Sequence, residues 1–200
     1  MYKHNLPKIL AVSICCTTCA APAALAWGGR WDRGGVDQAR GAYGVVFPIS
    51  QAEPNPRLTP GALNPDVSQA NIRSTICVRG YTRSIRPPEA YTERLKRASI
   101  RAYGYTDHRL RDYEFDHLVS LELAGSPDSP ANLWPEPHHV MGGWGSYAKD
   151  RLENKMHHLV CRGRLPLAQA QYEIAHDWIG AYRRYIGPTP NNARAHYYGG

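Results

Sequence analysis

The segment from residue 114 to residue 134 places the strongest constraint on the fold of this chain. Its middle, residues 124–131, reads Ala-Gly-Ser-Pro-Asp-Ser-Pro-Ala, which is a composition that ends regular structure and reverses the chain. The residues before it, 114–123, have the apolar content of an extended segment. Residues 132–134 predict a short return strand that stops at Pro135 and Pro137. The sequence therefore predicts a β-hairpin.

Helical periodicity is found on both sides of this hairpin. Apolar residues recur at the spacing of a buried helix face, with proline or glycine near the ends, in three stretches. These stretches are residues 87–104, 146–161 and 166–186. A further segment, residues 71–78, has the β-branched content of a short strand, which residues 81–85 extend. The predicted fold class is α+β, in which a β-hairpin plus helix is flanked by additional helices.

The chain is expected to divide into four parts. Lys3 and Lys8 precede a short apolar run, and Ala24-Leu25-Ala26 has the pattern of a secretory cleavage site. The next part is rich in Gly, Pro and Arg and lacks periodicity, which is typical of a poorly ordered lead-in. The expected parts are a signal peptide at 1–26, the lead-in at 27–65, one folded domain at 66–187 and a flexible tail at 188–200. The mature protein is expected to be exported, to the periplasm or beyond the cell, without a membrane span.

The charge favours an anionic partner. The formal net charge is +7, and loss of Lys3 and Lys8 with the signal peptide would leave about +5. A phosphate backbone is the obvious partner for such a protein, with salt-sensitive attraction. Many exported proteins are basic for solubility alone, so the charge is only a mild argument for nucleic acid.

Two cysteines, Cys77 and Cys161, remain after signal removal. In an oxidising compartment a pair with no third candidate predicts one disulfide. The mature chain has no Cys-x-x-Cys, so a structural zinc knuckle is not expected. The bridge would take over its stapling role and contribute on the order of 4 kcal/mol in the chain-entropy view.

The chemistry of the hairpin lies in Asp116, His117 and Asn132. Phosphodiester hydrolysis needs an activated water, neutralisation of phosphoryl charge and help for the departing alkoxide. A histidine near its ordinary pKa supplies the first, and a divalent ion on a carboxylate supplies the other two. Neighbouring side chains on a strand point to opposite faces, so Asp116 and His117 share a site only at a strand end or bulge. Asn132 would fix the histidine or the turn through hydrogen bonds to the backbone.

Longer stretches of the chain resemble small exported bacterial proteins of the HNH, or ββα-metal (His-Me finger), endonuclease type. The resemblance covers roughly residues 65–184 and lies in an ordered set of motifs. These are Thr75-Ile76-Cys77-Val78-Arg79-Gly80-Tyr81-Thr82, Arg86-Pro87-Pro88, Tyr91-Thr92, Ala102-Tyr103-Gly104-Tyr105, Asp116-His117-Leu118-Val119-Ser120-Leu121-Glu122-Leu123, Asn132-Leu133-Trp134-Pro135-Glu136-Pro137, Lys149-Asp150-Arg151-Leu152-Glu153-Asn154 and Asp177-Trp178-Ile179.

The resemblance implies a role for each of these hairpin residues. His117 matches the general base that activates water, Asp116 matches a metal ligand, and Asn132 matches the asparagine that holds the hairpin loop. The implied cofactor is a divalent ion, Mg²⁺ or Mn²⁺, with Zn²⁺ as an alternative.

The last metal ligand departs from the family pattern, because a longer Pro- and Gly-rich loop precedes the helix that would carry it. Asp150, Glu153 and Asn154 are all candidates, and Asn154 is favoured. Lys149 and Arg151 are candidates for binding the substrate phosphate, with ordinary pairing on a helix surface as the alternative.

The expected function is that of an exported, metal-dependent endonuclease that acts on DNA, with RNA not excluded. Two alternatives remain open. One is a catalytically inactive HNH-like scaffold that binds nucleic acid or a cell-envelope polymer. The other is a structural exported protein in which Asp116 and His117 belong to a core hydrogen-bond network. The paired histidines His138-His139 and His157-His158 are expected to lie mostly at the surface, because neighbouring histidines diverge and cannot chelate alone.

Overall fold

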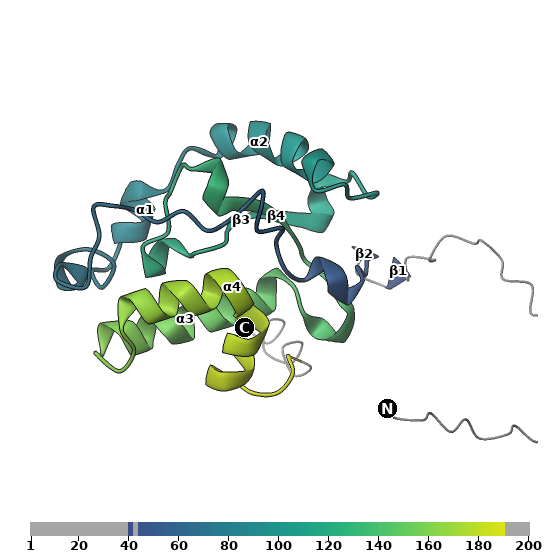
Figure 1. Ribbon diagram of the computed structural model, residues 1–200. Helices are drawn as coiled ribbons and strands as arrows, with labels where there is room; N and C mark the ends of the chain where they lie inside the picture. The colour runs from purple at the N-terminus through teal and green to yellow at the C-terminus, as the bar shows by residue number, and fades with distance from the viewer. Residues whose placement is uncertain (1–39, 42–43, 191–200) are drawn as a thin grey trace, which may run out of the picture. The chain divides into compact units, whose positions relative to one another are not determined.

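The computed structural model describes residues 40–41 and 44–190. The described chain combines helices with short antiparallel strand pairs, which is a broadly α+β arrangement (Figure 1). Its helices and strands are β1 (Arg40–Gly41), β2 (Gly44–Val45), α1 (Tyr81–Ile85), α2 (Glu89–Ala102), β3 (Tyr113–His117), β4 (Leu133–Pro137), α3 (Ser146–Cys161) and α4 (Leu167–Tyr185). The predicted signal peptide lies outside the described residues, as does the tail from residue 191 onward.

The predicted hairpin is formed by β3 and β4, which pair antiparallel. In this register Asp116 lies opposite Trp134, and His117 lies opposite Leu133 at the end of the ladder. The return strand is longer than predicted and contains both Pro135 and Pro137. Each strand of a two-stranded sheet is an edge, where a proline without an N–H is tolerated.

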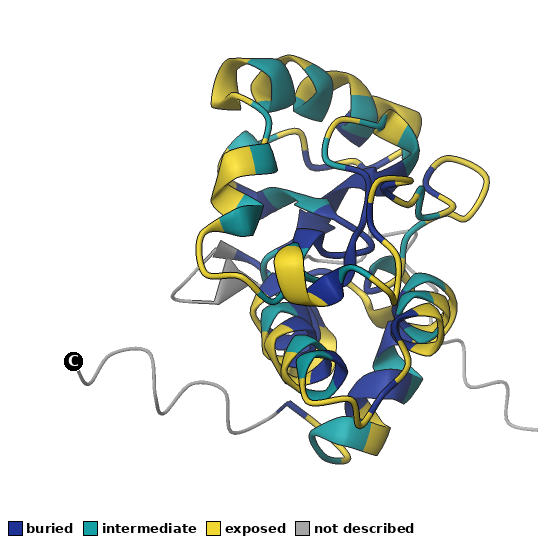
Figure 2. Cartoon of the chain, turned by 90° about the vertical axis from the view of Figure 1, so that its left-hand side faces the viewer, coloured by how far each residue is buried: buried dark blue, intermediate teal, exposed yellow. Residues whose placement is uncertain are grey.

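The three predicted long helices are confirmed as α2, α3 and α4, with ends within two residues of the expected ones. α3 and α4 bury the faces that their apolar spacing marks, as Ala170, Ile174 and Trp178 show in α4. In α2, only Ile100 of the expected face is buried. α3 and α4 pack against each other and lie on the other side of the hairpin from α2 (Figure 1). The buried faces of these elements enclose one apolar core (Figure 2).

The packed part of the chain begins about twenty residues earlier than predicted. Val45, Phe47 and Ala52 are all buried in the core, although they fall inside the predicted lead-in of residues 27–65. Phe47 exchanges two backbone hydrogen bonds with the segment after β4, and the Trp178 indole donates to the carbonyl oxygen of Ala52 at 2.8 Å. The prediction of poor order up to residue 65 is therefore wrong from about Val45 onward. These apolar residues enter the core one at a time and follow no regular spacing, so the sequence pattern does not reveal their burial.

The strand predicted at residues 71–78 is also wrong. Residues Ile72–Ser74 form a 3-10 turn, and the predicted extension is the helix α1. Ile72 and Ile76 are buried, so the apolar pattern records burial and not a strand. The side chains of Ser74 and Thr75 both donate to the carbonyl oxygen of Asn71, which favours a turn over an extended chain.

The predicted disulfide joins Cys77 to Cys161 at the C-terminal end of α3. It connects two segments that are 84 residues apart in sequence. Within the described part of the chain, no helix has the length and apolar character to cross a membrane.

Candidate functional site

The end of β3 places Asp116 and His117 beside the first turns of α3. The imidazole Nε2 of His117 lies 2.8 Å from the carbonyl oxygen of Pro127 in the hairpin loop. A carbonyl only accepts, so in the neutral ring Nε2 carries the proton and Nδ1 keeps the lone pair. Burial lowers the pKa of His117, against the opposing charge of Asp116, and the ring is therefore neutral at pH 7. The ring is therefore held in one orientation and one tautomer.

Asn132 holds the hairpin loop, as its position predicts. Its Oδ1 accepts a hydrogen bond from the backbone N–H of Val119, and its Nδ2 donates to the carbonyl oxygens of Val119 and Ser126. The side chain is fully buried. Since Pro127 directly follows Ser126, the amide also helps to fix the carbonyl that orients His117.

Lys149 is not the phosphate contact that the sequence suggests. Its side chain has no exposed surface, and its ammonium donates to Asp116 Oδ2 at 2.6 Å, to the carbonyl oxygen of His117 at 2.8 Å and to Glu153 Oε1. Burial disfavours the ammonium, but Asp116 and Glu153 more than offset this, so the pKa of Lys149 lies well above its ordinary value. A charge enclosed in this way is unavailable to a phosphate at the surface.

Several carboxylates surround this ammonium. They are Glu114 and Asp116 from β3, Glu136 from β4, and Asp150 and Glu153 from α3. Burial, reinforced by the charge of Asp116, raises the pKa of four of them: Glu114 to about 7, Asp150 to about 6, Glu153 to about 8 and Glu136 well above its ordinary value. Asp116 is the exception, because Lys149 overcomes the effect of burial and lowers its pKa. Negative charge is therefore in excess around a single buried cation.

The predicted metal ligands are brought together only in part. Asp116 and Asp150 are close enough for the charge of one to raise the pKa of the other, and both are partly exposed. Asn154, the favoured last ligand, is exposed, and its Nδ2 donates to the backbone carbonyl of Asp150. Glu153 is taken by Lys149. Asp150 is thus the better placed of the candidates on α3.

Arg151 and Arg86 differ in their relation to His117. Arg151, predicted to bind phosphate, is exposed and lies over the ring of Tyr182, with its guanidinium carbon 5.7 Å from the ring centre. Arg86, at the C-terminal end of α1, is exposed, and its positive charge lowers the pKa of both His117 and Asp150. Sequence reasoning did not single out Arg86, because its nearness to His117 and Asp150 arises only in the folded chain.

The site meets solvent along the carboxylates and not at the imidazole. The His117 side chain belongs to a residue that is only 4% exposed, whereas the side chains of Asp116 and Glu122 are 15% and 32% exposed. Two surface cavities, of about 280 and 300 Å³, lie beside residues 50–55 and along α4, and neither includes Asp116 or His117.

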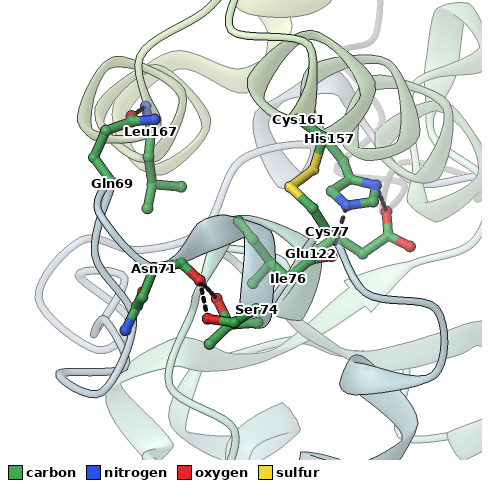
Figure 3. Close-up of a disulfide and its surroundings, with 10 residues drawn as sticks. Gln69, Asn71, Ser74, Ile76, Cys77, Glu122, His157, Cys161 and Leu167 are labelled. Atoms are coloured by element: carbon green, nitrogen blue, oxygen red, sulfur yellow. Dashed lines mark hydrogen bonds and ion pairs between the residues drawn. A yellow bond between two sulfur atoms is a disulfide. The ribbon is translucent and has the colours of Figure 1, made fainter.

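A second group of ligand-type side chains lies at the other end of α3. Cys77, Cys161 and His157 each offer a ligand atom, and these atoms all lie within 4.8 Å of one another. Among the described residues, this trio is the single group of three His, Cys, Asp or Glu side chains whose ligand atoms lie this close together. Such a group could hold a metal ion, but here its two sulfur atoms form the disulfide. Figure 3 shows the imidazole of His157 beside the bridge. The signal in the sequence is the spacing of His157 and Cys161, four residues apart on one helix face.

The chain was compared with protein-family models, with curated proteins and with solved structures, and none of these comparisons finds a match.

Proposed function

We propose that this protein is an endonuclease that hydrolyses phosphodiester bonds of nucleic acid, most naturally DNA, at a ββα-metal site of the HNH type formed by β3, β4 and α3. The observation that carries the proposal is the fixed imidazole at the end of β3. Its Nε2 is held by the carbonyl oxygen of Pro127, and the loop that supplies this oxygen is held in turn by Asn132. These contacts give the imidazole one tautomer and one orientation, which a general base needs.

His117 acts as the base in this proposal. Its Nδ1 takes a proton from a water molecule, and the resulting hydroxide attacks the phosphorus atom while the alkoxide leaves on the opposite side. The lowered pKa keeps Nδ1 free of a proton at neutral pH. Arg86 is exposed, and its charge acts on both His117 and Asp150, so it takes the phosphate-binding role first assigned to Lys149.

The residues present suit a divalent ion that is bound mainly by water and substrate. The carboxylates exceed the buried cation, and both carboxylate oxygens of Glu136 lack a hydrogen-bond partner. Among the described acids no three converge within 4.8 Å, so they form no closed cage. Mg²⁺ often uses one or two carboxylates together with waters and phosphate oxygens, and Asp116 with Asp150 would provide these. When bound, such an ion neutralises charge on the phosphoryl oxygens and on the departing alkoxide.

The test is a plasmid-cleavage assay with purified protein across Mg²⁺, Mn²⁺ and Zn²⁺, with EDTA as the metal-free arm. His117→Ala is expected to reduce cleavage by about 10²- to 10⁴-fold, because general-base catalysis contributes about that much. His158→Ala, which changes an exposed histidine on α3, is the matched control and should keep full activity. Far-UV circular dichroism establishes that both variants are folded. Undiminished cleavage by a folded His117→Ala protein would remove the imidazole from the mechanism.

A second candidate is a non-catalytic scaffold that binds nucleic acid or an envelope polymer. Two observations favour it: Lys149 already pairs with Asp116, and His117 is only 4% exposed. DNA binding that persists in EDTA, with no nicking under any of the three metals, is the result expected from the scaffold and not from the enzyme.

A further inference from the structure

The disulfide lies against a histidine that is held in place from two sides. The imidazole Nε2 of His157 lies 2.9 Å from the backbone carbonyl oxygen of Ile76, the residue before Cys77. Its Nδ1 lies 3.7 Å from the carboxylate of Glu122. Figure 3 shows the two side chains side by side. The ring therefore has a polar partner on each side while it stands beside the bridge. These contacts orient the imidazole with respect to both sulfur atoms.

The three side chains form a ligand set that suits a soft divalent cation. Two thiolates and one imidazole are among the donor sets that zinc takes in proteins, with metal–ligand distances of about 2.0 to 2.3 Å. Ligand atoms around such an ion are separated by less than about 4 Å, and the atoms of Cys77, His157 and Cys161 already lie within 4.8 Å of one another. Opening the S–S bond therefore calls for side-chain rotation but no movement of α3.

We propose that reduction of the Cys77–Cys161 disulfide converts this staple into a zinc site whose protein ligands are Cys77, Cys161 and His157. Water fills the fourth position. One imidazole nitrogen binds the ion, and the other keeps its polar partner, either the Ile76 carbonyl or Glu122, which is the usual second support of a metal-bound histidine. The same two sulfur atoms thus hold the segment of residues 72–78 to α3 in either redox state.

The chemistry balances with a phosphine or dithiol as reductant. The reductant gives two electrons to the S–S bond, the bond breaks, and each sulfur takes up a proton to become a thiol. Binding of Zn²⁺ then displaces both thiol protons to water. The three ligand residues are each partly exposed, so reductant and ion can reach them.

The experiment uses untagged protein in which Cys15, Cys16 and Cys19 are serine, so that thiolate ligation can come only from Cys77 and Cys161. The protein is reduced with a phosphine, desalted without oxygen and titrated with Zn²⁺ against a colorimetric chelator. The reduced protein is expected to bind one tightly held zinc per chain more than the oxidised protein. Co²⁺ in place of Zn²⁺ should give the absorption bands of a tetrahedral ion bound to thiolate.

His157→Gln and His158→Gln form the matched pair of variants, because the two histidines are neighbours on α3 and only His157 belongs to the trio. His157→Gln should raise the zinc dissociation constant at least about tenfold, and His158→Gln should leave it unchanged. Absence of thiolate bands with Co²⁺, or equal zinc affinity in both variants, overturns the proposal. The cobalt spectrum reports ligation directly, so it decides the matter even if reduction loosens the fold.

Discussion

Lys149 shows how a single residue can change the chemistry expected of a site. Its position beside Asp150 and Arg151 suggests a cluster of charges on a helix surface, but α3 turns this side chain into the core. There it pairs with Asp116, whose ionised form it favours, and it also donates a hydrogen bond to Glu153. The ammonium is therefore a structural cation that decides which acids remain ionised.

Replacing Lys149 by methionine should destabilise the protein by about 3 to 5 kcal/mol, because loss of one partner leaves buried charge unpaired. The measurement is the free energy of unfolding in urea at pH 7. Lys155→Met, at an exposed position of the same helix, should change it by less than about 0.5 kcal/mol. The double variant Lys149→Met with Glu153→Gln should recover part of the loss. A loss equal to that of Lys155→Met would show that the ion pairs carry no stability.

At the residue scale, the sequence predicts the participants of the site better than their partners. Asp116, His117 and Asn132 are recognisable from their order and spacing, and the bracing of the loop by Asn132 is confirmed. The acceptor for His117 is a backbone carbonyl in the loop, which any residue type would supply. The exposure of Asn154 also depends on how α3 is rotated against the hairpin, and adjacent polar residues do not reveal that rotation.

At the scale of elements, the loop between β3 and β4 depends on a close approach at Gly125. A Cβ atom there would lie 1.7 Å from the carbonyl oxygen of Val119 and 2.6 Å from Nδ2 of Asn132. Both atoms belong to the hydrogen bonds that hold the loop. The glycine is thus required for space, since its φ angle is not among the positive ones.

Gly125→Ala should therefore lower the free energy of unfolding by at least about 2 kcal/mol, through overpacking and the loss of a buried hydrogen bond. Gly104→Ala provides the comparison, because a Cβ at Gly104 meets nothing within 4 Å and only its positive φ of 70° opposes the change. That variant should cost about 1 to 2 kcal/mol. Thermal or urea unfolding of both variants is the measurement. If the loop could shift to make room, Gly125→Ala would destabilise the protein less than Gly104→Ala.

The helices α3 and α4 could be predicted from sequence because each buries a periodic apolar face over several turns. α2 buries only Ile100, and the prolines before it and the glycine after it are what mark its ends. The error at residues 71–78 has the opposite cause. Two buried isoleucines four residues apart suit a turn as well as a strand, and no neighbouring strand exists there among the described residues to pair with them. Short elements take their form from tertiary contacts, which local composition does not record.

For the whole molecule, the bridge from Cys77 to Cys161 is the main covalent constraint on the described chain, because it links segments 84 residues apart. Closing a loop of that length in the unfolded chain corresponds to about 4 to 5 kcal/mol of stability in the chain-entropy description.

The double variant Cys77→Ser with Cys161→Ser should show a loss of about that size in urea unfolding without reductant or zinc. The oxidised protein, carrying serine at 15, 16 and 19 in both cases, is the reference. A loss in the free energy of unfolding below about 1 kcal/mol would mean that the fold does not depend on the disulfide for its stability.

The burial of Phe47 and Ala52 determines where a truncated form of this protein can begin. A fragment that starts at residue 66 would contain every charged group of the proposed centre, yet it would leave the Trp178 indole without its acceptor and open the pocket that Phe47 fills. Such a fragment would expose apolar surface and associate with itself. A fragment that begins before residue 40 keeps Phe47 and Ala52 in the core.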